Sequence, residues 1–257
     1  MTDPTQETMA DDDLTERMEE LLRTAAMFQL LAMGFAYPAE GHHATVLERM
    51  RALPSRFAEE VLMAFHALRG QWEAGTEHLE EEHCRLFQGR KLVSLHETSF
   101  GDARRIGGQP VELSDISGFY RAFGMQLTES NPDMPDHLCT ELEFYSLLMV
   151  KQAYAMDQEW AEEEAITADA SGKFLELHLG RWLTPMLALL REHGGESVYV
   201  AWGDLLERVV NEECRRRAIT PQPFSGPVPL DDMQEDQFTC PMATTPPEAP
   251  EPPPGNL

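Results

Sequence analysis

Apolar residues recur three and four positions apart along most of the chain, a spacing that places them on one face of an α-helix. The first run begins at Leu14 and reaches Phe35, and Asp13 with Glu16 forms a capping-box pattern before it. Pro38 ends this helix, because the residue before a proline disfavours helical backbone. Equivalent runs predict further helices over residues 54–72, 76–87, 113–123, 136–160, 172–193 and 197–217.

Alternating strand patterns are almost absent, so the chain is predicted to be all-α. We expect a single helical-bundle domain of about eight or more helices over residues 13–218. Residues 89–111 interrupt the helical pattern with a connection longer than most helix–helix loops, and such connections are frequently functional. Residues 1–12 are acidic and residues 219–257 are rich in proline, and we expect both segments to be disordered.

The charge and cysteine content narrow the class of protein. Asp and Glu number 45 against 20 Lys and Arg, giving a formal net charge of −25, which disfavours nucleic acid and suits a cationic partner or simple solubility. The four cysteines lie far apart, as expected for reduced thiols in the cytoplasm. The N-terminus lacks the basic and apolar regions of an export signal, and no apolar run reaches the ~20 residues of a membrane span. We therefore expect a cytoplasmic protein.

Signatures of catalysis are weak. Carboxylate-bridged metal sites need Glu-x-x-His pairs on facing helices, and the chain offers only Glu80 with His83 and Glu40 with His43. There is no Gly-x-Ser-x-Gly elbow and no phosphate-binding glycine loop. The sequence thus predicts no catalytic residue, no metal and no cofactor, although a metal-dependent helical-bundle enzyme remains an alternative.

The stretch "NPDMPDHLCTELEFYSLLM", residues 131–149, carries the strongest local signal. Its prolines hold the incoming chain extended, and Asp136 is predicted to be the N-cap of the following helix with His137 next to it. That helix is apolar on nearly all sides, with Glu141 and Glu143 as its only early charges. Asp136 is either a simple cap beside an exposed histidine or part of a ligand-binding entrance.

Four segments resemble the TorD/DmsD/NarJ family of redox-enzyme maturation proteins. "MPDHLCTELEFYSLLM" resembles the Pro-Asp-His signature of that family, and "LSDISGFYRAFGM" resembles the helix before it. "EEHCRLFQG" and "LHETSFGD" resemble two upstream motifs in the same order. The resemblance covers roughly residues 20–215 and is closest to the NarJ-like branch, the delta subunits that serve type II enzymes of the dimethyl sulfoxide reductase family.

The resemblance implies a TorD-like all-helical chaperone. Such proteins bind the apo catalytic subunit of a molybdenum enzyme, often at its twin-arginine signal peptide, until the molybdopterin cofactor is inserted. They are absent from the mature enzyme. Carried over to this chain, the resemblance assigns peptide binding to residues of the signature, of the loop and of the preceding helix: Asp136, His137, Glu141, Glu97, Thr98, His96 and Tyr120. Met134 and His96 depart from the family pattern.

The residues and the resemblance together predict a client-specific assembly chaperone. We expect arginines of the signal peptide to meet carboxylates such as Asp136 or Glu141, and its apolar part to occupy a groove. Arg104 and Arg105 are internal and followed by glycines, so they are not such a signal themselves. The alternatives are the metal-dependent enzyme, which predicts bound iron or zinc, and a generic helical adaptor, which predicts indifference to twin-arginine peptides.

Overall fold

A computed structural model describes residues 4–53, 56–75, 78–88, 92–101, 108–126 and 134–227, with the side chains of α1 described from Asp13 onward. Over these residues the fold is all-α, as predicted, and the extended backbone pairs only at two isolated bridges. None of the described helices has the length and apolar character needed to cross a membrane. The helices are α1 (Pro4–Phe35), α2 (His42–Ala52), α3 (Glu59–Glu73), α4 (Leu79–Phe87), α5 (Gly108–Ala122), α6 (Leu138–Asp157), α7 (Ala161–Phe174), α8 (Gly180–Gly194) and α9 (Val198–Arg217).

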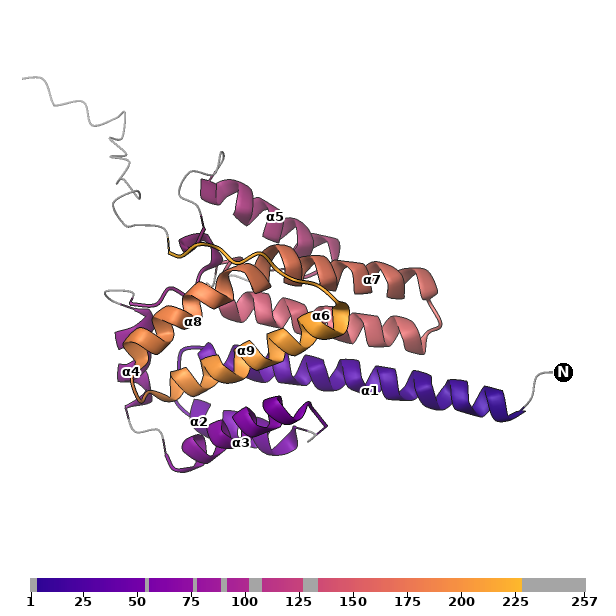
Figure 1. The fold of residues 1–257 in the computed structure, drawn as a ribbon, viewed down its shortest axis with the longest axis horizontal. Coiled ribbons are helices and arrows are strands. Elements are labelled where there is room, and N and C mark those ends of the chain that lie inside the picture. The colour runs from indigo at the N-terminus through magenta and orange to yellow at the C-terminus, as the bar shows by residue number, and fades with distance from the viewer. Residues whose placement is uncertain are drawn as a thin grey trace, which may run out of the picture.

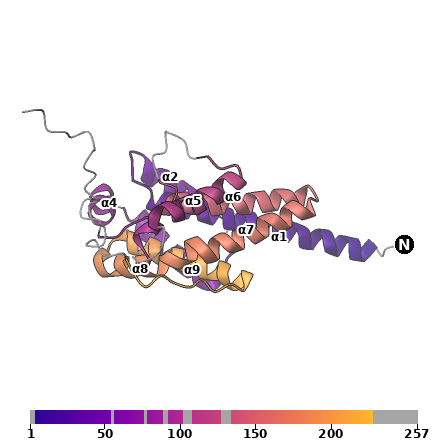
Figure 2. The same ribbon diagram turned by 90° about the horizontal axis from the view of Figure 1, so that it is seen from above.

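α1 and α6 lie side by side along the middle of the molecule and form its most extensive helix contact (Figure 1). α7 packs on another side of α6, while α9 packs against α3 and α8. In both views the N-terminal part of α1 extends beyond the other helices (Figure 2). This packing buries most of α6, which accounts for most of its apolar residues, whereas Val150 and Tyr154 remain exposed.

The core is built around large side chains of the central helices. Phe144, Tyr145 and Leu148 of α6 are completely buried, as the apolar sequence of this helix predicted. Gly34 of α1 permits close packing against α9, because a Cβ at this position would lie 2.4 Å from the ring of Trp202. The core therefore depends on one small residue of α1 as well as on its apolar stripe.

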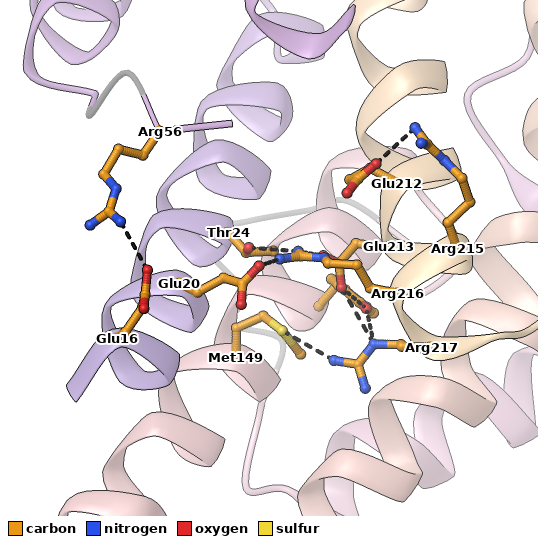
Figure 3. A network of polar contacts seen from close by, with 11 residues as sticks. Glu16, Glu20, Thr24, Arg56, Met149, Glu212, Glu213, Arg215, Arg216 and Arg217 are labelled. Carbon is orange, nitrogen blue, oxygen red and sulfur yellow. Dashed lines mark hydrogen bonds and ion pairs between the residues drawn. The ribbon is translucent and has the colours of Figure 1, made fainter. Parts of the chain in front are cut away.

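A buried ion-pair network joins α9 to α1 and α6 (Figure 3). Glu213 is 2% exposed, accepts a hydrogen bond of 2.9 Å from the Tyr145 hydroxyl, and pairs with both Arg216 and Arg217. Arg216 also pairs with Glu20 of α1. Burial raises the pKa of Tyr145 to about 12, although Arg217 opposes the shift. The C-terminal turn of α9 is thereby fixed to the two central helices.

The structure differs from the predicted helices near both ends of the bundle and between α6 and α8. α1 begins at Pro4, so Asp13 is inside the helix rather than at its cap, and the expectation of disorder for residues 1–12 is wrong for the helical backbone from Pro4. α2 and most of α7 were not predicted, because their short runs contain few large apolar residues. α3 begins at Glu59, whereas Pro54 lies outside the described residues.

The boundary predicted at residue 218 is also too early. Residues 219–227 pack on the helical body, where Phe224 is buried and its N–H donates to the Arg181 carbonyl over 2.9 Å. The remainder of the proline-rich tail, residues 228–257, lies outside the described part of the chain, as do Arg104 and Arg105.

Between α7 and α8 the helix widens into a π turn, Leu175–Leu179. Single π turns inside helices often occur at functional sites, because the extra residue redirects the side chains around it. Here the turn carries the buried His178. Pro185 follows inside α8, where it has no N–H to donate to the carbonyl four residues earlier.

Candidate functional site

The candidate site forms where residues 92–101, the site loop, meet residues 134–137, the entrance segment. The Glu97 N–H donates to the Asp136 carbonyl over 2.9 Å, and the Leu138 N–H donates to the Leu95 carbonyl over 2.8 Å. His96 and His137 form an isolated antiparallel bridge between these bonds. The structure therefore brings together the two motifs that the sequence analysis had selected separately.

The buried carboxylate of Asp136 anchors the site loop through hydrogen bonds. It is 2% exposed, and its carboxylate accepts hydrogen bonds from the Thr98 hydroxyl at 2.6 Å, the Thr98 N–H at 3.3 Å and His96 Nδ1 at 3.2 Å. Burial raises the pKa of Asp136, but the hydrogen bonds from His96 and Thr98 outweigh burial, so the pKa is lowered. Asp136 thus holds a buried negative charge against the loop.

The predicted cap of α6 is corrected by this geometry. The N-cap is His137, whose Nδ1 accepts a hydrogen bond of 3.3 Å from the Cys139 N–H. Asp136 does not cap α6 because its carboxylate is turned toward Thr98 and His96. Histidine is a rare cap, so the usual preference for aspartate misplaced the helix start by one residue.

Two further carboxyl groups of the site are buried: that of Glu141 in α6 and that of Glu97 in the site loop. The two residues are 0% and 1% exposed. Trp182 Nε1 donates to Glu141 Oε2 over 3.1 Å, and His178 Nδ1 lies 3.3 Å from both Glu97 oxygens. Glu141 Oε1 is buried without a hydrogen-bond partner among the described residues, so this carboxyl is only partly solvated by the protein.

Burial, followed by the negative charge of Glu97, raises the pKa of Glu141 well above its ordinary value, against a smaller opposing effect of the Trp182 hydrogen bond. Burial thus favours the neutral form of the Glu141 carboxyl in the folded chain. Because Glu141 is fully enclosed, it does not face a partner's arginine in this conformation, contrary to the sequence-based expectation.

Glu141→Gln is expected to flatten the pH dependence of stability. The folded chain retains a proton that the unfolded chain releases above the ordinary pKa of 4.5. The wild type therefore loses free energy of unfolding as the pH rises from that value toward the raised pKa of Glu141, at up to about 1.4 kcal/mol per pH unit. A glutamine keeps an acceptor oxygen for Trp182 and does not titrate. Urea denaturation over a pH series measures the difference, and parallel curves for the two chains would contradict it.

Tyr120 of α5 completes the support of the entrance segment. Its hydroxyl donates to the Pro135 carbonyl over 2.6 Å, and its ring packs 4.7 Å from that of Phe144. Burial raises the pKa of Tyr120 well above its ordinary value, so the hydroxyl remains a donor. Tyr120 is 2% exposed and holds the incoming backbone rather than facing solvent.

The exposed surface of the site consists of the residues above these buried supports. The His96 side chain is 32% exposed, Met134 is 48% exposed, and His137 is partly exposed. The two imidazole rings meet edge to face, with centroids 5.0 Å apart. A partner at this place would meet two histidines and a methionine, with the Asp136 charge directly beneath His96.

The sequence analysis did not select His178 or Trp182. His178 pairs with Glu97 and also lies 3.4 Å from Asp115 of α5, while Trp182 bonds Glu141. No local motif marks either residue, since their partners are far away in the sequence. The π turn that orients His178 leaves no periodic signal either.

The histidines of the two Glu-x-x-His pairs have structural partners. His83 is buried and its Nε2 lies 3.2 Å from the Phe35 carbonyl. His43 stacks on Trp72, and its Nε2 lies 2.8 Å from the Trp72 carbonyl. Over the described residues, no group of three or more His, Cys, Asp or Glu side chains is arranged to hold a metal ion.

Comparison with known proteins defines the family. Residues 51–188 match the family model described as the nitrate reductase delta subunit. This range includes the site loop, the entrance segment, the π turn and every site residue predicted from the sequence. The chain belongs to this family.

Its curated relatives are named as assembly chaperones of reductases. The chain is 27% identical over 221 residues to the perchlorate reductase assembly chaperone protein of Dechloromonas aromatica (strain RCB), covering 79% of this chain and 94% of the relative. It is 29% identical over 195 residues to the selenate reductase assembly chaperone protein of Thauera selenatis, covering 75% and 88%. It is 31% identical over 151 residues to the chlorate reductase assembly chaperone protein of Ideonella dechloratans, covering 58% and 75%.

Proposed function

We propose that this chain is an assembly chaperone for the catalytic subunit of a molybdenum-containing oxidoreductase. The observation that carries the proposal is the match to the delta-subunit family over residues 51–188, together with three relatives that are named reductase assembly chaperones. In this role the chain binds the apo subunit in the cytoplasm, holds it until the molybdopterin cofactor is inserted, and leaves before export.

In this proposal the client contacts the surface around His96, His137 and Met134. The buried carboxylates act from beneath: Asp136 holds the site loop, and Glu97 with Glu141 ties that loop to α6 and α8. The net charge of −25 attracts a cationic segment such as a twin-arginine signal peptide, because the field of the whole chain extends to its surface. The buried groups thus shape the surface, while the exposed rings touch the client.

Co-purification with the client tests the proposal. The full chain would be expressed with a candidate molybdenum-enzyme catalytic subunit, in its apo and cofactor-loaded forms and with its N-terminal signal present or deleted. We expect capture of the apo subunit, weaker capture without the signal, and none of the loaded form. Equal capture of apo and loaded subunits would contradict a chaperone role, and capture that survives signal deletion would contradict the signal-peptide assignment alone.

A further inference from the structure

Residues 219–227, which we call the strap, leave the end of α9 and run back across α8 to the site loop (Figure 1). The Phe224 N–H donates to the Arg181 carbonyl over 2.9 Å, and Arg181 Nε donates to the Gln222 carbonyl over 3.2 Å. Farther along, the Gly101 N–H donates to the Gly226 carbonyl over 3.0 Å. The strap is therefore held as an extended peptide, mainly through its backbone.

Pro185 makes the Arg181 carbonyl available as the acceptor of the strap's hydrogen bond. A proline has no N–H, so the carbonyl four residues earlier, that of Arg181, has no helical donor. The Phe224 N–H takes this position. Left without the strap, the carbonyl would be a polar group available to another extended backbone.

The surface beneath the strap is shaped for close contact. A Cβ at Gly180 would lie 2.5 Å from Pro221, so only a glycine allows the strap to approach α8. The Arg181 guanidinium lies 4.2 Å from the centre of the Phe224 ring, a distance typical of a cation–π contact. Arg181 thus recognises the aromatic side chain as well as the peptide backbone.

The strap covers only part of this surface. A groove of about 630 Å³ continues beside it between α8 and α9, with Leu183, Leu187 and Val210 among its lining residues. At its other end the strap is bonded to the site loop, where Phe100 pairs with Pro227 and stacks on Trp182, whose indole bonds Glu141. The surface under and beside the strap is therefore larger than the strap covers, and it continues to the candidate site.

We propose that the surface beneath residues 221–227 is a binding seat for an extended peptide segment of the client, and that the strap is its intramolecular competitor. The seat offers the Arg181 carbonyl as an acceptor, the Arg181 Nε–H and Gly101 N–H as donors, and a guanidinium that packs on an aromatic ring. Together these groups match an extended segment that carries an aromatic residue. This inference rests on the proposed chaperone function. Client binding releases the strap, and release of the client lets the strap close again.

The seat is tested with a fluorescent synthetic peptide of residues 219–227 added to the full chain. Phe224→Ala weakens the chain's own strap, so this variant is expected to bind the peptide at least about tenfold tighter than the wild type. Phe65→Ala is the matched control, because Phe65 is similarly buried and also lies under an arginine, but on α3. This control is expected to behave as the wild type. Pro223→Gly, which loosens the strap without removing a buried ring, provides a second strap variant if Phe224→Ala unfolds.

Adding Pro185→Ala to Phe224→Ala restores a helical donor for the Arg181 carbonyl and is expected to remove the gain in peptide binding. Adding the apo catalytic subunit is expected to release bound peptide. Equal peptide binding by the wild type and both strap variants would overturn the seat. If the client is captured but the peptide stays bound, the seat does not bind the client. If no form of the chain captures the client, both the proposed function and the assignment of the seat to the client are overturned.

Discussion

Asp136→Ala is expected to lower the free energy of unfolding by about 3 kcal/mol, because it removes a charged acceptor and leaves buried donors unpaired. Those donors are the N–H and hydroxyl of Thr98, together with His96 Nδ1. Asp136→Asn keeps an acceptor oxygen and the side-chain shape, so its loss should be smaller. Urea denaturation at neutral pH measures both variants.

The effect of Asp136 should also depend on pH in a defined direction. Its pKa is lowered in the folded chain, so its ionic contribution is present above the unfolded value of 3.8 and is lost as the pH falls through the lower folded value. The gap between the wild type and Asp136→Ala should therefore narrow in acid. A gap that is constant, or that widens on acidification, would show that Asp136 acts only through packing.

Glu213→Ala is expected to destabilise the chain by about 3 kcal/mol, since it removes a buried charged acceptor that two arginines and a buried hydroxyl share. Arg216 and Arg217 would both lose their shared carboxylate, and the Tyr145 hydroxyl would lose its acceptor (Figure 3). Thermal or urea unfolding of the purified variant measures the loss.

Glu212→Ala provides the matched control for this experiment. Glu212 is the adjacent residue and pairs with Arg215 over 2.7 Å, but its side chain is 26% exposed and that of Arg215 is 58% exposed. A pair of this kind contributes about 0–1 kcal/mol. Equal losses for the two variants would contradict the assignment of the buried network as the attachment of α9 to α1 and α6.

The all-α fold and its central helix could be predicted because their cause is local. Apolar residues on most sides of residues 138–157 predict a largely buried helix, and the structure packs α6 against α1 and α7, with Val150 and Tyr154 left exposed. α2 could not be predicted in the same way. Its eleven residues, His42–Ala52, bury only Val46 and Met50, so the apolar period was too weak to detect.

The sequence singled out two motifs for the candidate site but did not predict how they contact each other. The motifs around Glu97 and Asp136 were selected from the sequence, and the structure places them in contact. The direction of the Asp136 side chain was not predictable, because a cap and a loop anchor use the same carboxylate. The contribution of His178 depends on a π turn and on a contact across 81 positions, for which the sequence holds no local signal.

The structure also changes how the site residues are expected to act. Sequence reasoning placed Asp136 and Glu141 against the client's arginines, but both carboxyls are buried. In the proposed function these carboxyls support the loop, and the client contacts the exposed residues His96, His137 and Met134. A variant that alters the surface and preserves these supports therefore separates recognition from folding.

Met134→Ala combined with His137→Asn is such a variant. Asparagine is a favourable N-cap, so the start of α6 is preserved while the imidazole is removed. Leu22→Ala is the matched control, because Leu22 and Met134 are both 48% exposed and Leu22 lies on α1. Both chains should unfold within about 0.5 kcal/mol of the wild type if they act only at the surface.

The most direct test measures the molybdopterin content of the client catalytic subunit purified from cells that lack this chain. Such cells would be supplied with the wild type, with Leu22→Ala, or with the double variant. We predict cofactor-free client without the chain, full loading with the wild type and with Leu22→Ala, and little loading with the folded double variant. Full loading in the absence of the chain would contradict the assembly function, and full loading with the double variant would contradict the placement of client recognition at the His96–His137 surface.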